Sequence, residues 1–254
     1  MKRAQVRSGL RLARSAFAAL ALACAFGVLG AYSSSADSQW DQARQGGCAP
    51  EPAPAFSRNV LRISFANPSC ESGVRFRIDC EAGLIRLLFA SPASAPPSEL
   101  AYSGGPAACR ERGSEEALRA VSVIGSRGPD RLNVSRVRTP YLGPHSHIEG
   151  LLGDDVIEGT ATPDKIISGP GGEGRDDRDV VLGFAGDDII VSGRGKDIVR
   201  GGRSHDVLRG GSANDRLFGE QDRDALFGNS GHDLLVGGPG RDRFPDARGR
   251  QPNH

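Results

Sequence analysis

The sequence of 254 residues is poor in aromatic residues and methionine, with one Trp, three Tyr, ten Phe and one Met. Hydrophobic residues make up 38% of the chain, which is low for a conventional globular core of this length. Glycine is abundant instead, and 21 of the 35 glycines fall between residues 150 and 240. A globular average would place roughly 7 glycines per hundred residues there. The excess is local and periodic, and it indicates a repetitive architecture.

Several motifs of secreted enzymes and toxins are missing. The chain has no HExxH sequence of a zinc protease and no GxSxG sequence of a lipase-type hydrolase. The glycine-rich stretches GGEG and GGRS are not followed by the GK[ST] of a phosphate-binding loop. No long apolar or amphipathic segment follows residue 36, which argues against a cytolysin and against stable membrane insertion.

Residues 1–36 have the features of a signal peptide. Five basic residues and no acidic residue precede an apolar run over 15–31. Ser34 and Ala36 then form a small-x-small cleavage site. A membrane anchor or a lipoprotein signal at Cys24 fits less well. We therefore predict a secreted, extracellular protein that begins at Asp37. This mature chain has 27 Lys and Arg against 31 Asp and Glu, and the net charge of −4 argues against nucleic acid as a partner.

The mature chain has four cysteines, Cys48, Cys70, Cys80 and Cys109. An even number in an exported chain predicts two disulfides of undetermined pairing, and the lack of CxxC spacing disfavours zinc. Residues 37–58 are rich in proline and polar residues and are expected to be a linker. Residues 59–124 are expected to form a small β-rich region. Alternating apolar residues there predict antiparallel strands over 61–65 and 74–80.

The sequence LIRLLF, 84–89, is expected to form a further strand, and residues 115–123 either a short helix or a strand. From residue 125 the chain repeats every nine positions. Units at 125–133 and 141–149 fit loosely, the second with Ser146 in the place of an Asp. The next ten units are in phase except at a six-residue insertion. They are GLLGDDVIE, GTATPDKII, GRDDRDVVL, GFAGDDIIV, SGRGKDIVR, GGRSHDVLR, GGSANDRLF, GEQDRDALF, GNSGHDLLV and GGPGRDRFP.

In these ten units position 6 is always Asp, position 8 is always Ile, Val, Leu or Phe, and position 1 is Gly in nine. The pattern resembles the repeats-in-toxin (RTX), or haemolysin-type calcium-binding, nonapeptide family, whose signature is GGxGxDxUx with U a large apolar residue. The resemblance is close over 150–245, loose over 125–149 and absent before. It implies an all-β protein with a C-terminal parallel β-roll, an RTX-type β-solenoid over 125–245. A small β-rich disulfide-containing region would precede the roll, and a polar tail, 246–254, would follow it.

The repeat also has a physical interpretation of its own. In a three-residue strand over positions 7–9 only the side chain at position 8 points inward, and glycine lets the other six residues turn tightly. Two units then make one coil, so aspartates two units apart stack along each edge at about 4.8 Å per coil. Asp179, Asp197, Asp215 and Asp233 would line one edge, and Asp188, Asp206, Asp224 and Asp242 the other.

Such rows of like charge repel each other. Calcium, which takes about 6 to 8 oxygen ligands in irregular geometry, would relieve the repulsion together with glycine carbonyls. We predict several Ca²⁺ ions and coupled folding of 150–245, because one inward side chain per strand is a thin core. The predicted ligands are Asp155, Asp164, Asp179, Asp188, Asp197, Asp206, Asp215, Asp224, Asp233 and Asp242. The best sites are expected at Asp188, Asp197, Asp233 and Asp242, whereas Thr162 and Pro163 disturb the loop of Asp164.

Position 5 departs from the family pattern, because six units place a cation or histidine there: Arg178, Lys196, His205, Arg223, His232 and Arg241. These side chains would weaken calcium binding, or would replace calcium by pairing with aspartates of adjacent coils. His145 and His147 could be metal ligands on one strand face, although an exposed pair is the simpler interpretation.

Taken together, the sequence predicts a secreted, non-enzymatic calcium-binding protein with a structural or adhesive role and an unidentified cell-surface or extracellular partner. The alternative is a secreted enzyme with its catalytic site in 59–149 and the roll as a stabilising appendage.

Overall fold

A computed structural model of the chain describes residues 55–57, 60–67, 70–81, 84–90, 98–100, 118–137, 145–169 and 177–246. The predicted signal peptide, most of the linker and insertion, and nearly all of the polar tail lie outside these residues, as do Cys48 and Cys109. All regular elements within the described ranges are β-strands. No helix there is long and apolar enough to cross a membrane.

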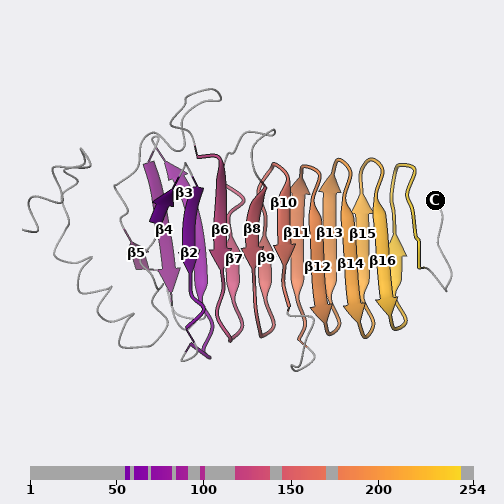
Figure 1. The fold of residues 1–254 in the computed structure, drawn as a ribbon, viewed down its shortest axis with the longest axis horizontal. Coiled ribbons are helices and arrows are strands. Elements are labelled where there is room, and N and C mark those ends of the chain that lie inside the picture. The colour runs from indigo at the N-terminus through magenta and orange to yellow at the C-terminus, as the bar shows by residue number, and fades with distance from the viewer. Residues whose placement is uncertain are drawn as a thin grey trace, which may run out of the picture.

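The strands form two sheets that face each other along one elongated roll (Figure 1). From β6 onward the chain alternates between the sheets, so the spatial neighbour of a strand is the strand two further along the chain. The eight-stranded sheet has the order β1 (Ala55–Ser57), β2 (Val60–Ser64), β6 (Ala120–Ile124), β8 (Ser146–Glu149), β10 (Asp164–Ile167), β12 (Ile189–Arg194), β14 (Val207–Ser212) and β16 (Ala225–Ser230). The nine-stranded sheet has the order β17 (Leu234–Val236), β15 (Arg216–Glu220), β13 (Ile198–Arg203), β11 (Val180–Ala185), β9 (Val156–Glu158), β7 (Arg131–Asn133), β3 (Arg75–Glu81), β4 (Leu84–Ala90) and β5 (Ser98–Leu100).

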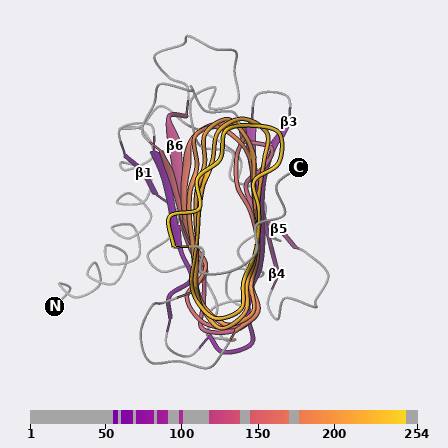
Figure 2. The ribbon, with the colours of Figure 1, turned by 90° about the vertical axis from the view of Figure 1, so that its right-hand side faces the viewer.

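The register of the parallel strands follows the nine-residue period. Val199 pairs with Leu217 and Leu208 with Leu226, each one coil of 18 residues apart. Across the insertion the step is 24 residues, from Ile166 to Ile190, and position 8 still faces position 8. Successive coils therefore superpose as one oblong ring when the roll is viewed along its axis (Figure 2). The parallel two-sheet architecture agrees with the expected β-roll.

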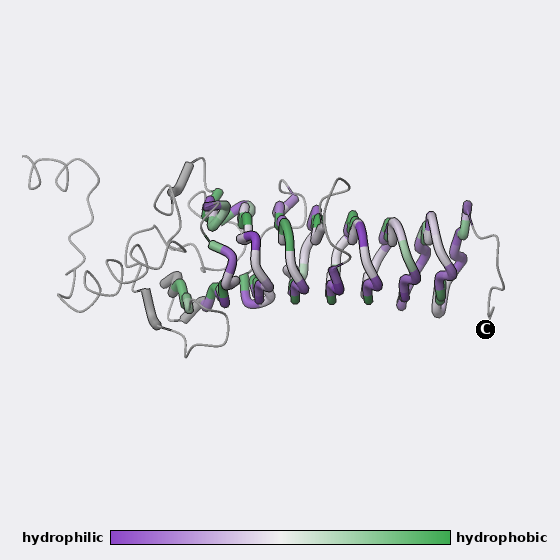
Figure 3. Tube along the Cα trace, turned by 90° about the horizontal axis from the view of Figure 1, so that it is seen from below, coloured by the Kyte–Doolittle hydropathy of each residue, from purple (hydrophilic) through white to green (hydrophobic). Residues whose placement is uncertain are grey.

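The centre of the roll is lined by the side chains at position 8. They are fully buried in eight successive strands: Ile157, Ile166, Val181, Ile190, Val199, Leu208, Leu217 and Leu226. Hydrophobic and hydrophilic residues consequently alternate around each coil (Figure 3). The expected strand length of three residues is wrong for β11–β14, which have six residues each. These strands continue through the buried residue at position 1, which is Ser192 in β12 and glycine in the others, into the following turn.

The predicted antiparallel pairing of residues 61–65 with 74–80 is also wrong. β2 and β3 lie in opposite sheets and pair in parallel with β6 and β7, so they form the first coil of the roll. Among the described strands, antiparallel pairing joins β1 to β2 and adds β4 and β5 to the sheet beyond β3. The alternation of apolar residues specifies the buried face of a strand, but it does not specify the neighbouring strand.

The N-terminal strands and the repeats share one hydrophobic core. Phe65 packs against Phe76 and Phe89 with ring centroids 5.4 and 5.3 Å apart, and this cluster is continuous with the position-8 side chains. Residues 115–123 are expected to form either a short helix or a strand, and within the described part of this segment residues 120–123 belong to a strand, β6 (Ala120–Ile124). Cys70 is fully buried and is disulfide-bonded. The predicted two disulfides and their pairing stay a prediction.

Candidate metal centre

The position-6 aspartates stack into two ladders, one at each edge of the roll. The backbone N–H of each aspartate donates to Oδ1 of the aspartate one coil further on, as from Asp188 to Asp206 at 2.9 Å and from Asp179 to Asp197 at 2.9 Å. The first ladder contains Asp130, Asp155, Asp179, Asp197, Asp215 and Asp233. The second contains Asp164, Asp188, Asp206, Asp224 and Asp242. All ten predicted ligands therefore lie in these ladders, which Asp130, absent from the predicted set, extends by one rung.

The second carboxylate oxygen, Oδ2, has no hydrogen-bond partner in seven of these aspartates although it is buried. They are Asp155, Asp179, Asp188, Asp197, Asp206, Asp215 and Asp224. Burying an oxygen that carries negative charge is costly unless a donor or a cation faces it. An Oδ2 atom without a partner recurs in successive coils, which indicates that one bound cation per turn would be needed along each edge.

In most of these units the glycine at position 1 leaves the space next to Oδ2 open, whereas the unit of Asp197 has Ser192 there. A Cβ atom on Gly201 would lie 2.2 Å from Asp206 Oδ2, and one on Gly210 would lie 2.3 Å from Asp215 Oδ2. A Cβ on Gly183 would meet both Asp188 Oδ2 at 2.3 Å and the carbonyl oxygen of Gly201 at 2.6 Å. Carboxylate and carbonyl oxygens thus border one small space, and these are the oxygen ligands that calcium accepts.

Burial raises the pKa of these carboxyls far above the ordinary value of 3.8. The pKa of Asp206 rises to about 8, and that of Asp188 to about 9 with a further contribution from the charges of Asp164 and Asp206. The pKa of Asp155 rises to about 10 through burial and the charge of Asp130. A cation beside Oδ2 favours the ionised form and lowers these pKa values. Cation binding and carboxyl ionisation are therefore coupled in the ladders.

Most turns keep one backbone shape even where glycine is absent. Positive φ angles recur at position 2 and position 4 of most units, including Phe184 and Glu220 at position 2 and Ser204, Ala213 and Asp222 at position 4. Non-glycine residues adopt such angles only with strain. The turns at Asp206, Asp215 and Asp224 therefore keep this backbone shape although their units lack glycine at position 4.

The basic side chains at position 5 lie at the surface of the roll. All six of these residues are exposed, and none forms an ion pair with a ladder aspartate in the described part of the chain. His205 instead faces Asp187, itself a position-5 residue, with Nδ1 3.5 Å from Oδ1. The contacts that a metal-free roll compensated by cations would need are therefore missing from the described residues.

The histidine pair does not form a metal cluster with the ladders. His147 Nε2 lies 2.5 Å from Glu149 Oε1 on the outer face of β8, and His145 is exposed. Among the described residues no three His, Cys, Asp or Glu side chains converge as a metal-binding group. Each coil supplies one ladder carboxylate per edge, so a cation there would also need backbone carbonyls.

The part of the chain that contains the ladders matches a family of calcium-binding repeats. The model of the RTX calcium-binding nonapeptide repeat matches in four copies, at residues 149–172, 172–208, 193–226 and 209–244. Residues 149–244 are RTX calcium-binding nonapeptide repeats. Comparisons with curated proteins and with solved structures gave no significant match. RTX repeats imply that the Asp-rich turns of this segment bind calcium. All ten predicted ligands lie within the matched residues.

Replacing Asp206 by Asn tests the ladder as a ligand set. The amide keeps an Oδ1 acceptor for the Asp188 N–H but removes the negative charge. We expect Asp206→Asn to bind at least one calcium ion fewer than the wild type in native mass spectrometry at equal calcium. Asp187→Asn is the matched control, because Asp187 is next to the ladder in sequence but is half-exposed and faces His205. Equal ion counts for Asp206→Asn and the wild type would contradict the assignment.

Proposed function

We propose that the protein is secreted and that its β-roll folds around Ca²⁺ held by aspartate side chains and glycine carbonyls, for a structural or adhesive role outside the cell. The observation that carries the proposal is the series of buried, unpartnered Oδ2 atoms beside glycine backbone. When bound, calcium supplies the positive charge that these carboxylates lack. The chain itself supplies the rest: position-1 glycine leaves room, and Oδ1 fixes each carboxylate by accepting a backbone N–H.

A location outside the cell fits the calcium affinity that we expect for these sites. Calcium modules outside cells bind in the range of about 10⁻⁴ to 10⁻³ M, where calcium is abundant. The roll would then stay unfolded during export and fold on arrival. Its rigid outer faces would present side chains to an extracellular partner, and no catalytic residue is part of the proposal.

The location and the enzyme alternative are tested together. We expect the full-length chain, expressed in a secreting host, to accumulate in the medium with an N-terminus at Asp37. The purified protein should leave peptide, ester and glycan substrates unhydrolysed. Retention in the cytoplasm would contradict the export part. Hydrolysis that is lost on replacing an acidic residue within 59–149 would favour the enzyme.

A further inference from the structure

Two of the aspartate turns are closed by a hydroxyl group of the protein itself. Ser126 donates its backbone N–H to Asp130 Oδ2 at 2.5 Å and its Oγ–H to Oδ1 at 2.6 Å. Thr160 makes the same two bonds to Asp164, at 2.5 and 3.0 Å. Both hydroxyls also accept the N–H of the residue two further on, at 3.2 Å. Neither aspartate has an unpartnered buried oxygen, unlike the seven described above.

The backbone of these two turns differs from that of the seven turns with positive φ at both position 2 and position 4, which belong to Asp155, Asp188, Asp197, Asp206, Asp215, Asp224 and Asp233. Neither Ser126 nor Thr160, at position 2, has a positive φ, and the same holds for the residues at position 4. Both units place proline at position 5, Pro129 and Pro163. The N–H of position 2 can therefore turn toward the carboxylate. We call these the closed turns, and those with positive φ at positions 2 and 4 the open turns.

The closed turns lie where the two ladders begin. Asp130 is the first rung of one ladder, and its Oδ1 also accepts the N–H of Val74 from the first coil at 2.7 Å. The other ladder begins with buried Ser146 at position 6, whose hydroxyl accepts the Val121 N–H at 3.3 Å and hydrogen-bonds to Asp164. Open turns start at Asp155 on one edge and at Asp188 on the other. The requirement for a cation thus changes along the axis of the roll.

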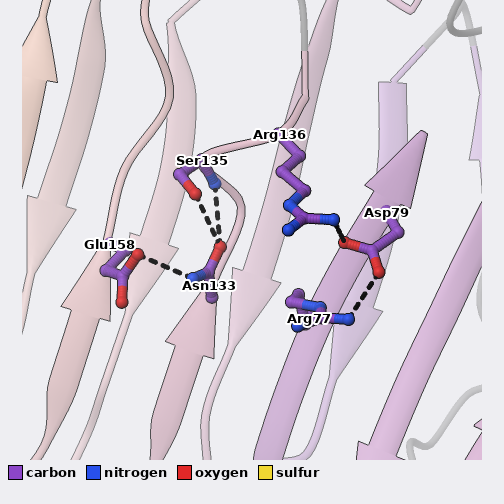
Figure 4. A network of polar contacts seen from close by, with 6 residues as sticks. All are labelled: Arg77, Asp79, Asn133, Ser135, Arg136 and Glu158. Atoms are coloured by element: carbon purple, nitrogen blue, oxygen red, sulfur yellow. Dashed lines mark hydrogen bonds and ion pairs between the residues drawn. The ribbon is translucent and has the colours of Figure 1, made fainter. Parts of the chain in front are cut away.

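The N-terminal coils also have more contacts that do not depend on metal. They contain the packed rings of Phe65, Phe76 and Phe89, whereas later coils place one aliphatic side chain per strand in the core. A polar network crosses their outer face (Figure 4). Arg77 and Arg136 contact Asp79 at 2.6 and 3.3 Å, and Asn133 donates to Glu158 at 2.6 Å.

We propose that β2 to β8, within residues 60–149, form a calcium-independent platform on which the open-turn coils, residues 177–246, fold when calcium binds. This proposal rests on the proposed calcium-dependent folding. The platform presents Asp130, Ser146 and the edges of β7 and β8 as a template for the next coil. Residues 150–167 are the junction, with one open turn at Asp155 and one closed turn at Asp164.

Hydrogen exchange of the mature chain, followed by mass spectrometry with calcium and with EDTA, tests the platform. We expect amides of β2, β3, β6, β7 and β8 to be protected in both conditions, and those of β11–β17 only with calcium. If both parts need calcium equally, the platform is wrong although the proposed function stands. If β11–β17 stay protected in EDTA, the proposed calcium-dependent folding itself fails.

Two variants separate the hydroxyl closure from general stability. In EDTA, Ser126→Ala should speed exchange in β3 and β7 about tenfold, because a hydrogen bond to a buried carboxylate is lost. Ser122→Ala, on the outer face of β6, should leave exchange unchanged. Conversion of the closed turn GTATPD to GGAGND, by Thr160→Gly, Thr162→Gly and Pro163→Asn, should add one calcium ion in native mass spectrometry. An unchanged ion count, or equal effects of the two serine variants, would overturn the role of the closed turns.

Discussion

Removal of calcium from the mature protein is expected to abolish most of the β-structure in residues 177–246. The apolar core of these coils is one position-8 side chain per strand, and six of their ladder aspartates have a buried Oδ2 without a hydrogen-bond partner. Burying one apolar side chain per strand stabilises the fold by less than the conformational entropy lost in ordering nine residues that include several glycines. Calcium binding supplies the missing free energy, as at other metal sites that form only on folding.

Far-UV circular dichroism with a calcium titration after EDTA treatment measures this effect. We expect the β-signal to fall by more than half in EDTA and to return at millimolar calcium. Magnesium at the same concentration is the control and should restore little, because it demands near-octahedral geometry and keeps several of its waters. A β-spectrum that is unchanged by EDTA would contradict the coupling of folding to calcium.

Acidification is expected to restore order to the calcium-free roll. The folded-state pKa values of Asp206 and Asp188, about 8 and 9, lie above the ordinary value of 3.8 because of burial. The folded state therefore binds protons that the unfolded state releases. This contribution to stability is complete below about pH 4 and is lost as the pH rises through the folded pKa values. Each such carboxyl changes the folding equilibrium by about tenfold per pH unit within that window.

Calcium reverses the direction of this pH dependence. Protons compete with calcium for Oδ2, so the calcium affinity should fall as the pH is lowered from 8 to 5. We expect the β-signal in EDTA to be larger at pH 5 than at pH 8, and the calcium midpoint at pH 5 to be higher by tenfold or more. Asp206→Asn should flatten both dependences. A calcium midpoint that is independent of pH would contradict buried, protonatable ligands.

The structure of the repeats could be predicted from the sequence because the same residue types recur at the same positions of every nine-residue unit. Asp at position 6 and an apolar residue at position 8 specify which side chains face inward and which stack, and the two ladders follow from two units per coil. The insertion did not disturb this prediction, since the register from Ile166 to Ile190 is kept. The first coil was not predictable in the same way, because β2 and β3 carry no repeat and alternation leaves the pairing partner open.

The closed turns were missed although the sequence contains a signal for them. GSRGPD and GTATPD both have a hydroxyl residue at position 2 and proline at position 5, where the other units lack this combination. The hydroxyl can accept an N–H and donate to the carboxylate only when position 2 avoids positive φ, and this conformation is not encoded by the period. The exposure of Arg178, Lys196 and Arg223 was equally hidden, because the period does not say which way a turn side chain points.

The most direct test is a crystal structure of the mature protein grown in millimolar calcium, with the anomalous signal of calcium recorded. The account predicts anomalous peaks in a row along each edge, bordered by Oδ2 of the open-turn aspartates and by backbone carbonyl oxygens, with none at Asp130. Ladders without calcium peaks, with the Oδ2 atoms still unpartnered, would contradict it.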